Sequence, residues 1–102
     1  MDLKPGSRWK SAVCAAEAVV VRPPTAPTTL QCGGTAMLGH AEPRPEGPAP
    51  AAGHDTGATV GKRYVDEASG LEILCGKSGE GAFAADGRIM QVKEAKKLPA
   101  SD

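Results

Sequence analysis

The sequence predicts a mainly β protein with little or no helix, built from two small tandem β-hairpin modules packed as a pseudo-dimer. Three observations support this prediction. Short runs of strand-forming residues are separated by Pro and Gly, an Asp-Gly dipeptide lies between two of these runs, and the two halves of the chain align with each other. The predicted parts are a first module at residues 5–40, a linker at 41–61, a second module at 62–92 and a charged tail at 93–102.

The first module contains two predicted strands. Residues 19–21 are three consecutive valines followed by a pair of prolines, and residues 28–31 form a second β-prone run. Branched side chains favour strands, whereas Pro cannot donate a backbone hydrogen bond to a neighbouring strand. We therefore expect a hairpin with a long proline-bearing loop.

The segment 41–61 has the composition of a linker. It holds four Pro, four Gly and five Ala, with almost no side chain that could fill a core. Such compositions are typical of flexible or polyproline-like connections. We expect a flexible linker between two folded modules.

The second module contains four predicted strands. Residues 62–65 and 71–75 flank a Ser-Gly turn, and residues 82–84 and 88–92 flank Asp86-Gly87. Asp-Gly favours a type I′ hairpin turn, because both central residues of that turn need positive φ. The tail is charged and is expected to be frayed, or at most one short helical turn.

The two modules align at an offset of 55 residues, which becomes 53 after a shorter loop in the second copy. A module of about 35 residues buries too little apolar surface to fold alone, so association of two copies would stabilise both. Chance alignment of Gly- and Val-rich hairpins is the alternative. The aligned pairs are Arg8 with Arg63, Trp9 with Tyr64, Cys14 with Ser69, Glu17 with Glu72, Leu30 with Phe83, Gly34 with Gly87, and Met37 with Met90.

Two structural expectations follow from the alignment. Trp9 and Tyr64 should bury comparable areas, because they occupy equivalent places. Leu30 should pair with Phe83 near a pseudo-twofold axis. Halves with unrelated topologies would end the repeat interpretation.

The first module contains a series of short motifs around Cys14 and Cys32. The run Trp9-Lys10-Ser11-Ala12-Val13-Cys14 is followed by Val19-Val20-Val21 and then by Leu30-Gln31-Cys32-Gly33-Gly34-Thr35-Ala36-Met37. This pattern resembles desulforedoxin and the amino-terminal module of desulfoferrodoxin. In that family a Tyr-Lys pair, Cys-x-x-Cys, a Val-x-Val strand, a Gly-rich loop and Cys-Cys-Gly-x-x-Met place four thiolates around one iron.

The resemblance implies a site that has lost ligands. Cys14 and Cys32 would occupy ligand positions, whereas Ser11 and Gly33 stand in place of the other two thiols. The corresponding positions of the second module are Asp66, Ser69, Ala85 and Asp86, so no tetrathiolate site is expected there.

Cys14 and Cys32 are the candidate metal ligands, for iron or zinc. Tetrahedral sites use four ligands, so two thiols need completion by the pair of a second chain, by Cys75 or by His40. The alternative is that the thiols simply fill a small core. If the turns of the family are kept, the two sulfurs face each other closely enough for mild oxidation to join them, while Cys75, a predicted core residue, stays free.

No catalytic or cofactor-binding residues are predicted. Gly76-Lys77-Ser78 lacks the first glycine and the helix of a phosphate-binding loop, and Gly79-x-Gly81-x-x-Ala84 lacks the βαβ unit of a dinucleotide site. His40 and His54 are expected to be solvated loop residues. The counts of 12 basic and 12 acidic residues argue against nucleic acid and membrane partners. With three cysteines and no signal peptide or apolar span, the cytoplasm is the expected location.

Two functions remain open. The leading hypothesis is a small non-catalytic accessory protein that binds a protein partner through exposed strand edges. The alternative is an iron- or zinc-binding redox or metal-handling protein that uses Cys14 and Cys32, with a homodimer as one way to assemble four thiolates.

Overall fold

The structure is a computed structural model that describes residues 1–45, 47 and 49–93. These residues form ten strands and no helix, which confirms the prediction of a mainly β protein. In the described part of the chain, no helix is long and apolar enough to cross a membrane.

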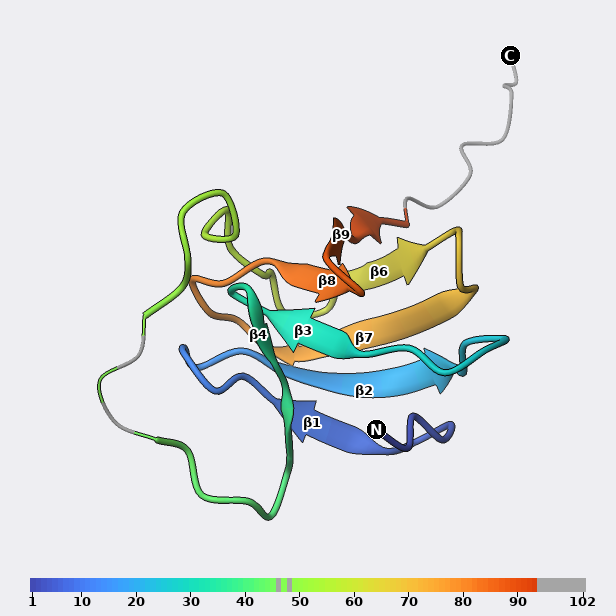
Figure 1. The fold of residues 1–102 in the computed structure, drawn as a ribbon, viewed down its shortest axis with the longest axis horizontal. Helices are drawn as coiled ribbons and strands as arrows, with labels where there is room; N and C mark the ends of the chain where they lie inside the picture. The colour runs from blue at the N-terminus through green and yellow to red at the C-terminus, as the bar shows by residue number, and fades with distance from the viewer. Residues whose placement is uncertain (46, 48, 94–102) are drawn as a thin grey trace.

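Six strands form a large antiparallel sheet and four form a small one (Figure 1). The large sheet has the order β10 (Gln91–Val92), β6 (Arg63–Asp66), β7 (Leu71–Lys77), β2 (Glu17–Arg22), β1 (Arg8–Lys10) and β5 (Leu38–Gly39). The small sheet has the order β4 (Thr35–Ala36), β3 (Leu30–Cys32), β8 (Phe83–Ala85) and β9 (Arg88–Ile89).

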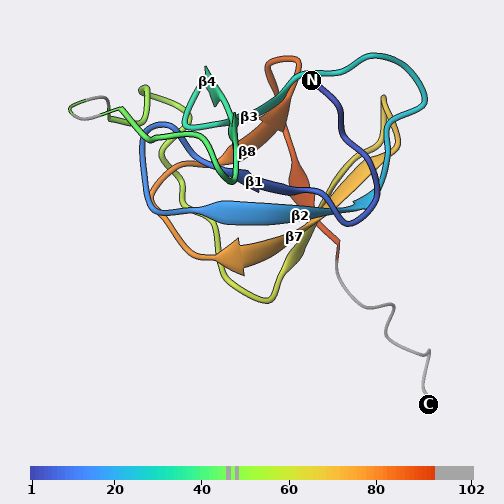
Figure 2. The same ribbon diagram turned by 90° about the horizontal axis from the view of Figure 1, so that it is seen from below.

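The core lies between the two sheets. Figure 2 shows β3 and β8 on one side of β2 and β7. Alternate residues of these strands point inward and are buried, as the two-residue period of a strand requires. The buried set includes Leu30, Cys32, Phe83 and Ala85 from the small sheet and Ala18, Val20, Ile73 and Cys75 from the large one.

The two halves of the chain, residues 1–40 and 62–93, have the same strand topology. Each sheet is centred on a pair of strands that occupy aligned positions, β2 with β7 and β3 with β8. In these pairs Val19 lies opposite Leu74 and Gln31 lies opposite Ala84. These partners are 55 and 53 residues apart, the two offsets of the alignment. The strand order and the register at these two central pairs are therefore symmetric between the two halves.

The expected pairing of Leu30 with Phe83 is wrong. Leu30 lies opposite Ala85, and Phe83 lies opposite Cys32. The reason is that the antiparallel register is centred on Gln31 and Ala84, so the aligned residues sit diagonally on either side of the centre. Phe83 instead packs edge-on against Tyr64, with ring centroids 5.1 Å apart.

The expected equal burial of Trp9 and Tyr64 is also wrong. Tyr64 is buried, whereas Trp9 is only partly buried. The Tyr64 ring is covered by Phe83, and its hydroxyl accepts a hydrogen bond from the Thr59 backbone N–H at 2.9 Å. Trp9 donates to the Ser7 hydroxyl at 3.0 Å. The aromatic pair of the second half therefore encloses its position more completely.

The loop after β2 does not close a hairpin, contrary to the sequence-based expectation. β2 pairs with β1 and β7, whereas β3 belongs to the other sheet. Residues 23–29 include three prolines and cross between the sheets. Within this crossing the Thr25 N–H donates to the Ser69 carbonyl at 2.8 Å. The strands β2 and β3 therefore each take one partner from their own half and one from the second half.

The two hairpins expected in the second half are present, but the run 88–92, expected as one strand, is divided between the sheets: β9 pairs with β8, whereas β10 pairs with β6. β6 pairs with β7 across the turn at residues 67–70, and β8 pairs with β9 across Asp86-Gly87. Asp86 has φ 48° and Gly87 has φ 83°, so both central residues have the positive φ of a type I′ turn.

Much of the segment expected to be a flexible linker is fixed against both halves. The Ala51 N–H donates to the Gly33 carbonyl at 2.9 Å, and the Ala82 N–H donates to the His54 carbonyl at 2.8 Å. Ala58 exchanges two backbone hydrogen bonds with Gly79. Most side chains of this segment are small, and these contacts with the two halves are backbone hydrogen bonds, which the composition did not predict.

Candidate functional site

Cys14 lies in an irregular turn between β1 and β2, and Ser11 shapes this turn. The Ser11 hydroxyl oxygen accepts hydrogen bonds from the backbone N–H groups of Val13 and Cys14, both at 3.1 Å. Ser11 is completely buried. A buried polar group needs such partners, because an unpaired one is costly. The turn is therefore held by a side-chain acceptor rather than by strand pairing.

Cys32 ends β3 and faces this turn. Its Sγ lies 3.8 Å from the Sγ of Cys14, and both thiols are free. Cys14 is partly exposed, whereas Cys32 exposes none of its surface. We call these two residues the dithiol site.

The loop at Gly79 and Gly81 covers the dithiol site. A Cβ at Gly79 would lie 2.8 Å from the Cys14 sulfur, and one at Gly81 would lie 2.9 Å from the Cys32 sulfur. Real Cβ atoms do not approach this closely, so only glycine permits the contact. The Gly81 N–H also donates to the Cys14 sulfur at 3.3 Å. These glycines, dismissed above as a failed dinucleotide motif, are thus part of the site.

The pKa values of the two thiols are shifted in opposite directions. Burial alone would raise the pKa of Cys14, but hydrogen bonds from Ser11, the Ala16 and Gly81 backbone and Cys32 together outweigh it and lower the pKa. Burial raises the pKa of Cys32 to about 12, because the Ser11 hydroxyl only partly opposes the desolvation. Cys14 is therefore the more readily ionised thiol.

The other candidate ligands lie elsewhere. Cys75 is buried on β7 opposite Ala18, and its thiol donates to the Lys77 carbonyl at 3.1 Å. His40 lies beyond β5, where its Nε2 is 3.5 Å from the Glu17 carboxylate. Among residues 1–45, 47 and 49–93, no three His, Cys, Asp or Glu side chains are spaced to hold one metal ion.

The aligned corner of the second half has different chemistry at the turn between β6 and β7. Asp66, Ser69 and Ala85 occupy the places of Ser11, Cys14 and Cys32. The Asp66 carboxylate accepts from the Ser69 N–H at 3.2 Å and from its hydroxyl at 2.6 Å. Arg88 also donates to this carboxylate, at 2.9 Å. The Arg88 hydrogen bonds hold the pKa of Asp66 below its usual value despite burial.

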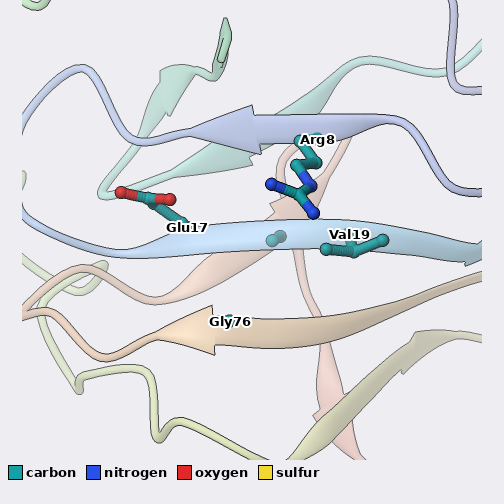
Figure 3. Close-up of a pocket in the computed structure, with 5 residues that line it drawn as sticks. Arg8, Glu17, Val19 and Gly76 are labelled. Carbon is teal, nitrogen blue, oxygen red and sulfur yellow. The ribbon is translucent and has the colours of Figure 1, made fainter.

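A second set of aligned groups lies on the outer face of the large sheet. Figure 3 shows Arg8 reaching from β1 over β2, from which Glu17 extends, at a pocket of about 270 Å³. In the second half Glu72 is buried and bound by Arg63 at 3.5 Å and Lys93 at 3.0 Å. Lys93 is thus an ion-pair partner rather than part of a frayed tail, and residues 94–102 of the predicted tail lie outside the described residues.

Comparisons with protein-family models, with curated proteins and with solved structures found no match to this chain. The resemblance to desulforedoxin therefore stays a prediction from the motif pattern. The geometry of the dithiol site is independent of that resemblance.

Proposed function

We propose that the protein is a small non-catalytic binding protein that holds a thiophilic metal ion, zinc or ferrous iron, through Cys14 and Cys32. The observation that carries this proposal is the 3.8 Å between the two sulfurs. A tetrahedron's edge is about 1.63 times its centre-to-corner distance, so two thiolates with Zn–S bonds of about 2.3 Å lie about 3.8 Å apart. The pair already has the spacing of two ligands on one ion.

The surroundings of Cys14 favour a thiolate. Metal ligands must be deprotonated, and amide N–H groups directed at sulfur stabilise the negative charge. Cys14 receives such a bond from Gly81 and has a lowered pKa. A bound cation would in turn favour ionisation of Cys32, whose pKa is high in its absence.

A partner protein would complete the coordination, because the pair supplies only two of four ligands. The partial exposure of Cys14 leaves an approach on its side, whereas Cys32 is enclosed. A second copy of this chain, contributing its own pair, is one such partner. Three unpaired cysteines agree with a reducing compartment, and we place the protein in the cytoplasm.

The proposal includes a tandem origin for the scaffold. The centring of both sheets on aligned residues supports it, because two modules related by a twofold rotation would pair in this way. One module would then have kept two thiols, while the other replaced its thiol positions with Ser69 and Ala85.

Metal content and mass measured together test the proposed function. Full-length protein, purified without chelator and titrated anaerobically with Zn²⁺ or Fe²⁺, is analysed by elemental analysis and native mass spectrometry. We expect one ion per chain or per two chains, lost in Cys14→Ser and Cys32→Ser and kept in the matched control Cys75→Ser. Absence of bound ion after titration, or retention of the ion in Cys32→Ser, would contradict the proposal.

Partner binding without metal is a second candidate. The large sheet ends at two very short strands, β5 and β10; Val92 on β10 is exposed, as is Ile89 on β9 at the edge of the small sheet. Open edges can pair with another chain. A Val92→Lys variant should then lose a partner captured by wild type from the native host, while the ion content stays unchanged.

A further inference from the structure

The dithiol site combines one accessible and one enclosed sulfur at short range. Cys14 lies in a bend outside the strands and is partly exposed, whereas Cys32 is fully buried 3.8 Å away. We propose that the metal-free protein exchanges with low-molecular-weight disulfides, with Cys14 as the attacking thiol and Cys32 as the resolving thiol. This activity goes beyond metal binding and does not depend on it.

Cys14 has the features of an attacking thiol. The thiolate is the nucleophile in disulfide exchange, and nearby hydrogen-bond donors increase its population at neutral pH. The Gly81 N–H donates to the Cys14 sulfur at 3.3 Å, which places such a donor at this thiol. Its partial exposure gives a small disulfide access that Cys32 does not have.

Cys32 has the features of a resolving thiol. It exposes none of its surface and lies against Gly81, so an external disulfide cannot reach it directly. A disulfide bond is about 2.05 Å long, so the sulfurs must close by roughly 1.8 Å from their 3.8 Å separation. Cys14 belongs to no strand, so its turn can move without breaking a strand hydrogen bond.

The exchange balances in two steps. First, the Cys14 thiolate bonds to one sulfur of the external disulfide, whose S–S bond breaks and releases one thiolate. Second, Cys32 loses its proton to a departing thiolate and attacks the Cys14 sulfur, which releases the other thiol. Overall the protein dithiol loses two electrons and two protons, and one external disulfide becomes two thiols.

Cys75 provides an internal control for this proposal. It is buried, its thiol is bonded to the Lys77 carbonyl, and burial raises its pKa. Unspecific oxidation of the three thiols would also leave Cys75 until last, so the order of oxidation alone does not test the proposal. Only a resolving thiol converts a mixed disulfide into a disulfide within the protein.

Trapping the mixed disulfide is the decisive experiment. Reduced full-length protein, freed of metal with a chelator, is incubated with oxidised glutathione, quenched in acid, alkylated and mapped by mass spectrometry. Wild type and Cys75→Ser should form a Cys14–Cys32 disulfide and release two glutathione thiols per chain. Cys32→Ser should accumulate one glutathione on Cys14, and Cys14→Ser should form neither product.

Three results would overturn the proposal: no Cys14–Cys32 disulfide in wild type, a first adduct on Cys32 or Cys75, or a Cys32→Ser variant whose adduct is released as fast as in wild type. Near-UV circular dichroism checks that each variant is folded. Loss of metal binding in the earlier experiment leaves these outcomes unaffected, so the two proposals fail separately.

A measurement on wild type alone avoids any folding defect of the variants. The rate of alkylation by iodoacetamide is measured at each cysteine against pH. Cys14 should react at least about tenfold faster than Cys75 near pH 7, because it is partly exposed and accepts the Gly81 N–H, whereas Cys75 is buried. Equal rates, or faster reaction at Cys32 or Cys75, would overturn the assignment of Cys14 as the attacking thiol.

Discussion

The dithiol site and the aligned corner of the second half lie at aligned turns and differ in chemistry. In the first, the Ser11 hydroxyl accepts the N–H of Cys14; in the second, the Asp66 carboxylate accepts the N–H of Ser69. The side chains that the turns present are two thiols in one case and an ion pair with Arg88 in the other. Both turns therefore place a side-chain acceptor at their first position, while the groups around that acceptor differ.

The two halves also differ in how each contributes to the core. Leu30 and Phe83 occupy aligned positions and are both fully buried, and Phe83 packs edge-on against the Tyr64 ring. The second half thus combines an aromatic core pair with paired charges, whereas the first has an aliphatic residue at the aligned core position and two free thiols. We expect the second half to contribute more stability.

Truncation of Phe83 should have the largest effect. Phe83→Ala should lower the free energy of unfolding by about 4 kcal/mol and Leu30→Ala by about 3 kcal/mol, since both leave cavities at buried positions. The difference includes about 1 kcal/mol from the lost edge-on contact with Tyr64. Urea unfolding followed by circular dichroism measures both. An equal or greater loss for Leu30→Ala would contradict the ranking of the two halves.

Acidification should lower the stability of the folded protein through the buried carboxylates of the second half rather than through the dithiol site. Hydrogen bonds from Arg88 lower the pKa of Asp66, and those from Lys93 lower the pKa of Glu72. A carboxyl whose folded pKa is depressed adds stability above its unfolded pKa of about 4, and this stability is lost as pH falls through the folded pKa. We expect the urea midpoint to fall as the solution is acidified below about pH 5.

The Asp66→Asn variant separates the contribution of this turn. It keeps an acceptor for the Ser69 N–H but removes the charge that pairs with Arg88. The urea midpoint should be lower than that of wild type at pH 7, and the loss on acidification should be smaller. Ser11→Ala is the matched change in the first half, and its acid dependence should follow wild type. An unchanged acid dependence in Asp66→Asn would show that Glu72 or another group controls it.

Local signals account for the parts of the fold that the sequence predicted. Asp86-Gly87 specifies its turn through residues that accept positive φ, and the runs at β6 and β7 are close enough in the chain to form a hairpin. The alignment of Cys14 and Cys32 with two ligand positions also assigned both to one site, and their sulfurs lie 3.8 Å apart.

The parts that sequence reasoning missed depend on contacts between distant residues. Nothing near Val19 in the chain indicates that β2 pairs with β7, so β2 and β3 were wrongly joined as a hairpin. The role of Gly79 and Gly81 appears only once Cys14 and Cys32 lie beneath them. The backbone hydrogen bonds of residues 51–61 likewise leave no trace in composition. Non-local strand pairing is set by register across the whole sheet, which short patterns do not encode.

The smallest expected effect concerns the aligned carboxylates on the outer face of the large sheet. The Glu72 side chain exposes 3% of its surface and contacts Lys93 at 3.0 Å, whereas the Glu17 side chain exposes 30% and lies 3.5 Å from His40. The second contact is an ion pair only when the imidazole is protonated.

Exposed pairs contribute little, because water and salt screen them and long side chains lose freedom. Lys93→Met, which keeps an apolar stem, should therefore cost about 0.5–1 kcal/mol at pH 7, and His40→Ala about 0–0.3 kcal/mol. Arg63 limits the first loss, since it also contacts Glu72. Urea unfolding at low and high salt measures both, and the cost of Lys93→Met should shrink as salt is added. A greater loss for His40→Ala than for Lys93→Met would mean that Glu17, not Glu72, depends more on its cation.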